Sequence, residues 1–127
     1  MIYEQKTGRF CRDNGKLLGV GYSGHGEGKN NPTLQHVHNV GPIPCGDYTI
    51  GPPRNSKKRG PYVLPLMPDP TNEMFERSAF LIHGDSIKTP GTASEGCIIL
   101  SRKVREAIWA SEDKRLKVIE EVLDGAV

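Results

Sequence analysis

The chain has 127 residues, of which 35% are apolar and 25% are charged, and its formal net charge is +2. This length predicts a single domain, residues 1–127, that can bury a core but leaves no room for a second one. The net charge is too small for a nucleic-acid-binding surface, and no window approaches the roughly 20 apolar residues of a membrane span, so we expect neither partner.

The first half of the chain is predicted to contain short strands joined by tight turns. Fifteen Gly and ten Pro are spread along the sequence, which favours many short elements over a helical bundle. Asp13-Asn14-Gly15 predicts a hairpin turn, because Asn and Gly accept the positive φ that such turns require. The expected strands are residues 2–5, 9–12, 17–20 and 47–50. Residues 21–40 form a long loop rich in Gly, His, Asn and Pro, of the kind that is often functional in a compact domain.

Three further strands are expected in the second half, at residues 62–67, 79–83 and 96–100. Pro65 confines the first of them to a sheet edge or a bulge, since proline has no N–H for the ladder. The basic segment from Arg54 to Arg59 is interpreted as a solvated loop that could meet an anionic substrate.

One or two helices follow. Ser101 is a good N-cap for a helix through about Trp109. The apolar residues expected on its inner face are Val104, Ala107 and Ile108. Residues 116–122 fit either a second helix or a closing strand, so the predicted fold class is mostly β with one or two short helices.

The stretch from Ala79 to Leu100 gives the strongest sign of chemistry. An apolar run ends at His83, and fourteen residues later Cys97 opens a second apolar run. Two neighbouring strands joined by a loop would bring the imidazole and the thiol together at one end of the sheet. A thiol is a poor nucleophile at neutral pH until a base or a positive environment favours the thiolate. Cys97 is therefore the candidate nucleophile and His83 the candidate base, and the alternative is a buried structural cysteine with a strand-end histidine.

Residues around this pair have candidate supporting roles. Gly96 lets the backbone approach a ligand closely, and exposed amides at such a turn could donate to a developing oxyanion. The second ring nitrogen of His83 needs an acceptor, which is either a nearby backbone carbonyl or Asp85. Ser94 either bonds within the turn or lines the site.

The remaining cysteines and histidines leave two questions. If Cys97 is reactive, Cys11 and Cys45 are left either as a disulfide pair in an oxidising compartment or as two unpaired thiols. His36 and His38 share a face of an extended segment, but their spacing matches no familiar zinc pattern. We therefore expect no metal site and no cofactor.

Several motifs, in chain order, resemble a known family. His83-Gly84 followed by Ser94-Glu95-Gly96-Cys97 resembles the active-site motif of L,D-transpeptidases of the YkuD type. Earlier segments are similar to the Tlde1-like branch, type VI secretion effectors that attack peptidoglycan in rival bacteria. These segments are Tyr22-Ser23-Gly24-His25-Gly26, Gly28-Lys29-Asn30-Asn31-Pro32 and Gly41-Pro42-Ile43-Pro44-Cys45-Gly46-Asp47-Tyr48-Thr49-Ile50. The resemblance extends from about Tyr3 to about Val118.

The resemblance implies a YkuD-like β-sandwich or barrel and a specific reaction. Cys97 would attack the carbonyl of the diamino acid in a peptidoglycan tetrapeptide stem and expel the terminal D-alanine. His83 would be the base, oriented by the backbone carbonyl of Gly84. Water would release the thioester as an L,D-carboxypeptidase product, a free D-amino acid would give exchange, and a second stem would give a cross-link. The substrate-binding and oxyanion residues implied are Gly96, Ser94, Asp85, Tyr22 and His25.

Two positions depart from the broad family. Glu95 stands where a second His is usual, and Ile99 stands where an Arg is frequent. A carboxylate pointing inward would disfavour the thiolate, so we expect Glu95 to face solvent or a backbone amide. Arg102 is a candidate substitute for the missing arginine, as the partner of a substrate carboxylate.

The resemblance also implies partners and a location. We expect a monomer that is secreted without a signal peptide, since the first residues lack its basic and apolar regions. It would act in the target-cell periplasm, with a cognate immunity protein and a secretion-machine carrier as partners. The alternative is a catalytically inactive peptidoglycan-binding domain on the same scaffold. An NlpC/P60-type amidase is disfavoured because such enzymes place Cys before His, whereas His83 precedes Cys97.

Overall fold

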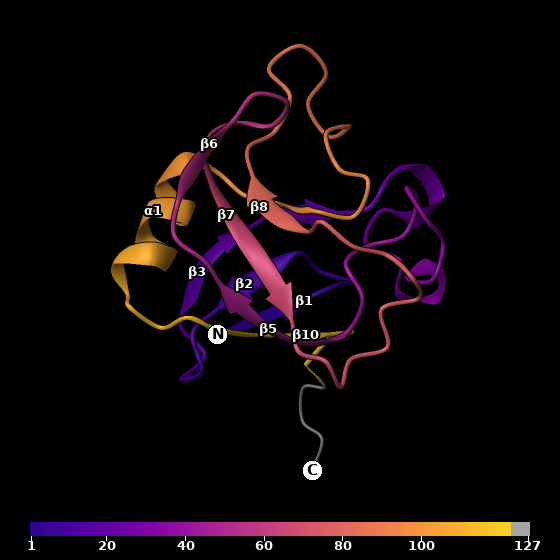
Figure 1. Ribbon diagram of the computed structural model, residues 1–127, viewed down its shortest axis with the longest axis horizontal. Helices are drawn as coiled ribbons and strands as arrows, with labels where there is room; N and C mark the ends of the chain where they lie inside the picture. Colours follow the sequence, from indigo (N-terminus) through magenta and orange to yellow (C-terminus); the bar gives the residue numbers. More distant parts are fainter. Residues whose placement is uncertain (123–127) are drawn as a thin grey trace.

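The computed structural model describes residues 1–122, so the last five residues of the expected 1–127 domain lie outside it. The elements in chain order (Figure 1) are β1 (Ile2–Glu4), β2 (Arg9–Cys11), β3 (Leu17–Val20), β4 (Tyr22–Ser23), the 3-10 turns η1 (Gly26–Gly28) and η2 (Pro32–Leu34), β5 (Gly46–Ile50), β6 (Arg54–Ser56), β7 (Gly60–Pro68), β8 (Leu81–His83), β9 (Ile98–Ile99), α1 (Arg102–Ala110) and β10 (Arg115–Ile119). The expectation of a mostly β fold is confirmed.

The strands form one open, mixed sheet in the order β3-β2-β1-β10-β5-β7-β8-β9-β4, with β6 beside β7. Neighbours are antiparallel except for β1 with β10 and β8 with β9. The two edge strands, β3 and β4, are consecutive in the chain and separated only by Gly21. The N–H of Gly21 donates to the carbonyl of Gly8 at 2.8 Å, and a Cβ at Gly21 would overlap the carbonyl of Ile99. The sheet thus curls until its two ends meet at one glycine, where only a residue without a side chain fits.

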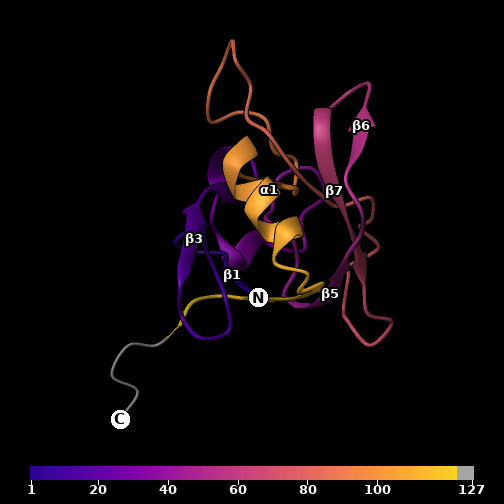
Figure 2. The same ribbon diagram turned by 90° about the vertical axis from the view of Figure 1, so that its left-hand side faces the viewer.

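Helix α1 packs against β3 and β7 (Figure 2) and also against β8. The Ser101 hydroxyl accepts a hydrogen bond from the N–H of Val104 at 3.3 Å, as expected of an N-cap. The expected inner face is wrong at one position: Ala107 is exposed, and Arg105 is buried beside Ile108 instead. Arg105 is accommodated because its guanidinium donates to backbone carbonyls. Among the described residues, no helix has the length and apolarity needed to cross a membrane.

Strand boundaries differ from the expectation in the segments flanking the candidate site. Strand β8 begins only at Leu81, because Ala79 adopts a left-handed φ of +64° that no extended strand contains. Strand β9 is limited to Ile98–Ile99, because Gly96, with φ +138°, also leaves the extended conformation. The segment 54–56, expected to be a solvated loop, is strand β6 paired with β7.

Of the two alternatives expected for Pro65, the sheet edge is wrong and the bulge is confirmed: β7 lies inside the sheet, and the register shifts by one residue opposite Pro65. Pro65 is located where β7 changes partner from β6 to β5, between the pairs Arg54↔Val63 and Ile50↔Leu66. Its carbonyl accepts from the N–H of Gly51 at 2.8 Å. In an antiparallel strand the N–H and C=O of a residue face the same neighbour, so the missing N–H faces this break in pairing.

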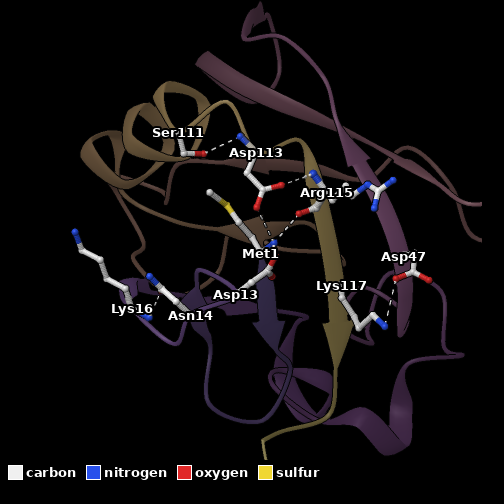
Figure 3. A network of polar contacts seen from close by, with 9 residues as sticks. All are labelled: Met1, Asp13, Asn14, Lys16, Asp47, Ser111, Asp113, Arg115 and Lys117. Carbon is white, nitrogen blue, oxygen red and sulfur yellow. Dashed lines mark hydrogen bonds and ion pairs between the residues drawn. The ribbon is translucent and has the colours of Figure 1, made fainter.

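Residues 115–119 form the closing strand, one of the two alternatives left open, and β10 lies between β1 and β5. Its start is fastened to Met1 (Figure 3). The Met1 ammonium donates to the carbonyl of Arg115 at 2.7 Å and forms ion pairs with Asp113 at 3.3 Å and Asp13 at 3.0 Å. Along the long loop 21–40, the structure adds β4 and the two 3-10 turns.

Candidate active site

His83 is the last residue of β8, and Cys97 directly precedes β9, the strand that lies parallel to β8. The register pairs Ile82 with Ile98 and His83 with Ile99. One step back along this register, Cys97 lies beside Leu81, so Cys97 and His83 are on the same face and offset by two residues. From the ordinary spacing of strands and residues, their Cα atoms are about 8 Å apart, a separation that two side chains can bridge.

His83 is held as a neutral imidazole with one free nitrogen. Its Nδ1 lies 2.8 Å from the carbonyl oxygen of Gly84, which can only accept, so Nδ1 bears the proton. Gly84, and not Asp85, is therefore the acceptor that orients the ring. Burial lowers the pKa of His83, and the charges of Arg59 and Arg105 lower it further. The hydrogen bond to Gly84 acts in the opposite direction and raises this pKa. Within residues 1–122 the buried Nε2 atom has no hydrogen-bond partner, which leaves a lone pair available to accept a proton.

Cys97 is 8% exposed, and its thiol is protonated at rest. Burial raises the pKa of Cys97, while the N–H of Leu81 and the charges of Arg59 and Arg77 act in the opposite direction. The Sγ atom is 4.0 Å from the carbonyl oxygen of Ala79. In the described part of the chain, no hydrogen bond joins Sγ to Nε2 of His83. The resting pair is thus a neutral thiol and a neutral imidazole rather than a preformed ion pair.

Ser94 organises the turn that presents Cys97. Its fully buried hydroxyl donates to the carbonyl of Cys97 at 2.6 Å and accepts from the N–H groups of Gly24 at 2.8 Å and Gly96 at 3.1 Å. The carbonyl of Gly96 accepts in turn from the hydroxyl of Ser23 at 2.9 Å. The Gly96 amide is therefore already bonded within the protein, and Ser94 lies beneath the turn rather than facing the solvent.

Tyr22 and Asp85 fasten the loop between β8 and β9. The Tyr22 hydroxyl donates to Asp85 at 2.6 Å and accepts from the N–H of Ala93 at 2.9 Å. Asp85 also accepts from the N–H groups of Ser86 at 2.8 Å and Gly91 at 3.1 Å. Burial and the bond to Asp85 raise the pKa of Tyr22 to about 12, so the phenol remains a donor at neutral pH. These two predicted site residues thus shape the loop beside His83.

Arg77 is a functional candidate that the sequence does not reveal. Its buried guanidinium donates to the carbonyls of Gln35 at 2.6 Å, Pro42 at 2.8 Å, Gly41 at 2.9 Å and Glu95 at 3.1 Å. A Cβ at Gly96 would overlap the guanidinium, so Arg77 lies directly behind the turn that presents Cys97. No local pattern around residue 77 distinguishes this arginine from an exposed one.

The other residues singled out from the sequence lie elsewhere. His25 is exposed at the start of η1. Cys11 and Cys45 are both free, and the Cys45 thiol donates to Gln5 Oε1 at 3.2 Å. Within residues 1–122, no three His, Cys, Asp or Glu side chains gather in a way that could hold a metal ion.

In the comparison with protein families, residues 19–122 match the Tlde1 domain. The matched segment runs from the end of β3 past β10, and it includes both His83 and Cys97. Comparison with the curated proteins and with the solved structures finds no match.

Proposed function

The chain belongs to the Tlde1 domain family, and from this premise we propose that it is a cysteine-dependent enzyme acting on peptidoglycan tetrapeptide stems. It removes the terminal D-alanine, exchanges it for another D-amino acid, or does both. The proposal rests chiefly on His83, whose Nδ1 is bonded to Gly84 and whose buried Nε2 has no partner in the described residues. An unsatisfied buried nitrogen costs about 1–3 kcal/mol, and such groups are rare in folded proteins unless they serve a purpose.

In the first step, Nε2 of His83 accepts the thiol proton of Cys97 as Sγ attacks the carbonyl carbon of the diamino acid. Catalytic hydrogen bonds are often long in the absence of substrate, and they tighten in the reactive complex. The proton then passes from His83 to the nitrogen of the leaving D-alanine, the C–N bond breaks, and a thioester remains on Cys97.

In the second step, water or the amine of a free D-amino acid attacks the thioester, and His83 accepts a proton from the attacking group. Water gives a tripeptide with a new carboxylate, and an amine gives an exchanged tetrapeptide. In both cases the Cys97 thiol is regenerated, so the cycle consumes only the stem and the acceptor.

Family membership supports a role as a type VI secretion effector. Removal or exchange of terminal D-alanine in a rival's periplasm would deplete the donors that cross-linking requires. Expression of wild-type protein exported to the periplasm of a bacterium is expected to inhibit growth. Cytoplasmic expression, and periplasmic expression of Cys97→Ala, are expected to be harmless, whereas equal toxicity of both proteins would contradict the enzymatic effector.

The direct test is mass spectrometry of purified tetrapeptide muropeptides after incubation with the protein. Wild type is expected to produce tripeptide, or exchanged tetrapeptide when a D-amino acid is added. Cys97→Ala and His83→Ala are both expected to be inactive, because an unassisted thiol is only a few per cent thiolate at neutral pH.

Matched controls are available in the same chain. Cys45→Ser removes a free, half-buried thiol outside the site, and His36→Ala removes an imidazole of the long loop. Both should retain wild-type activity. Tetrapeptide left unchanged by wild type, or full activity in Cys97→Ala, would refute the enzyme.

The second candidate function is a non-catalytic peptidoglycan-binding domain. The low exposure of Cys97 and the raised pKa of its thiol favour this reading. Intact-protein mass spectrometry after mixing with tetrapeptide separates the two. A thioester adduct that is lost in Cys97→Ala supports the enzyme, and stoichiometric binding without adduct or turnover supports the binding domain.

A further inference from the structure

A cavity of about 340 Å³ lies beside His83, between the β6–β7 hairpin and the loop joining β8 to β9. These two segments project at the same end of the molecule (Figures 1 and 2). Residues lining the cavity include Lys58 and Arg59 from the hairpin, His83 and Gly84 from the end of β8, and Asp85 and Ala93 from the loop. The candidate base therefore shares one cavity with two cationic side chains.

Arg59 is fixed at the tip of this hairpin. Its N–H donates to the Ser56 hydroxyl at 3.0 Å, and Gly60, with φ +92°, allows the chain to turn immediately afterwards. The side chain is 22% exposed and extends toward the loop, where Nη1 is 3.5 Å from the carbonyl of Ala93. Nη2 is 3.9 Å from the carboxylate of Glu95. Arg59 thus lines the cavity beside His83, and both of these guanidinium contacts are long.

The other arginines near the site are committed to the protein itself. Arg77 and Arg105 are buried and donate to backbone carbonyls. Arg102, the candidate expected from the sequence, lies over the ring of Tyr62 at 4.6 Å, pairs with Glu106 at 3.4 Å, and is not part of the cavity lining. Among the arginines of residues 1–122 that lie around the site, Arg59 is the one with donors left for a ligand.

We propose that Arg59 binds a carboxylate of the substrate, and that the carboxylate of Glu95 occupies this position until the substrate displaces it. This inference rests on the proposed function. A guanidinium offers two parallel N–H donors to a carboxylate, which fixes both its position and its orientation. The Glu95 contact is long, and the Glu95 side chain is 57% exposed, so its replacement by a closer carboxylate sacrifices little.

A tetrapeptide stem can present two carboxylates, the terminal one of D-alanine and the one on the side chain of the diamino acid. Both have the same chemistry toward a guanidinium. Substrate analogues distinguish them: one with a C-terminal carboxamide, and one with lysine in place of a carboxylate-bearing diamino acid.

The experiment measures binding by calorimetry in the Cys97→Ala background, where turnover cannot interfere. Arg59→Met is expected to weaken tetrapeptide binding by about 10- to 100-fold, the range for a charge-assisted hydrogen bond. The affinity of Arg59→Lys should lie between those of the protein with Arg59 and of Arg59→Met, because lysine keeps the charge but lacks the two parallel N–H donors of the guanidinium. Glu95→Gln should tighten binding, because it removes the competing charge.

The analogues assign the carboxylate. One of the two analogues lacks the carboxylate that Arg59 binds. The protein with Arg59 intact should bind this analogue as weakly as Arg59→Met binds the full tetrapeptide. The affinity of Arg59→Met should be the same for this analogue as for the full tetrapeptide. Lys57→Met, a neighbouring exposed cation outside the cavity lining, is the matched control and should bind like wild type. Thermal unfolding of each variant establishes that it is folded.

The inference and the proposed function can fail separately. Equal binding by wild type and Arg59→Met, or equal weakening by Lys57→Met, overturns the carboxylate site even if muropeptides are cleaved. Loss of binding in Arg59→Met together with inactive wild type retains the carboxylate site and rejects catalysis. Weaker binding by Glu95→Gln would show that Glu95 supports the ligand rather than competes with it, and would overturn the displacement.

Discussion

Removal of the Ser94 hydroxyl is predicted to destabilise the fold by about 3 kcal/mol or more. In Ser94→Ala the N–H groups of Gly24 and Gly96 and the carbonyl of Cys97 all lose their partner in a fully buried position. Each unsatisfied buried group costs about 1–3 kcal/mol, and the volume of one oxygen atom is too small to admit a water as a replacement. Three such groups, taken at the low end, give about 3 kcal/mol, a large part of the roughly 5–15 kcal/mol that stabilises a typical domain.

Urea unfolding monitored by circular dichroism measures this loss as a lower midpoint with an unchanged slope. Thr92→Ala is the matched control, because its hydroxyl lies in the same loop but is exposed and bonded locally to Thr89. That variant should remain within about 0.5 kcal/mol of wild type. A loss of less than about 1 kcal/mol in Ser94→Ala would show that the three bonds do not act as the geometry indicates.

Four further predictions concern the same site. As the pH falls, kcat/KM should decrease only below pH 6.5, because burial lowers the pKa of His83 and only the neutral imidazole accepts the thiol proton. A decrease that begins above this pH would contradict the assignment of His83 as the base. The unfolded chain binds the extra proton first, so the free energy of unfolding should fall as the pH drops from about 6.5 through the lowered pKa, and urea melts of His83→Asn should lack this contribution. Gly96→Ala should lower Tm and activity, because φ +138° strains an L-residue and the new Cβ would overlap Arg77; wild-type melting would refute this. Tyr22→Phe should raise hydrogen exchange in residues 85–93 by about tenfold, the value of one lost hydrogen bond to Asp85, and unchanged exchange would exclude that role.

The parts of the fold that the sequence predicts are those governed by local rules. The turn at Asp13-Asn14-Gly15 forms as expected, with the N–H of Gly15 donating to the carbonyl of Arg12 at 2.9 Å. Strand β6 has no such signal, because Arg54-Asn55-Ser56 is polar and lacks alternation. It pairs only because the turn at its end returns the chain along β7. Pairing that depends on a nonlocal partner cannot be read from one segment.

The site divides in the same way. His83 stands at the end of one apolar run and Cys97 at the start of another, so the side-by-side placement of these two segments follows from the pattern of burial. Arg77 and Arg105 resemble surface residues in the sequence, since what permits their burial is a set of backbone carbonyls from distant segments. Arg59 could be identified as basic, but its orientation toward the loop depends on the turn geometry of the β6–β7 hairpin.

The charge of Arg59 acts on both Cys97 and His83. Its effect on substrate binding can therefore be distinguished from its effect on proton transfer. This charge lowers the pKa of Cys97, which favours the thiolate, and lowers the pKa of His83, which disfavours the imidazolium. Transfer of a proton from Sγ to Nε2 creates both ions together, so the two effects of one charge oppose each other and largely cancel. A carboxylate bound at Arg59 would likewise change both pKa values in the same direction. In active enzyme, Arg59→Met is therefore expected to raise KM and leave kcat nearly unchanged, and a fall in kcat of about tenfold at constant KM would assign Arg59 to the chemical step instead.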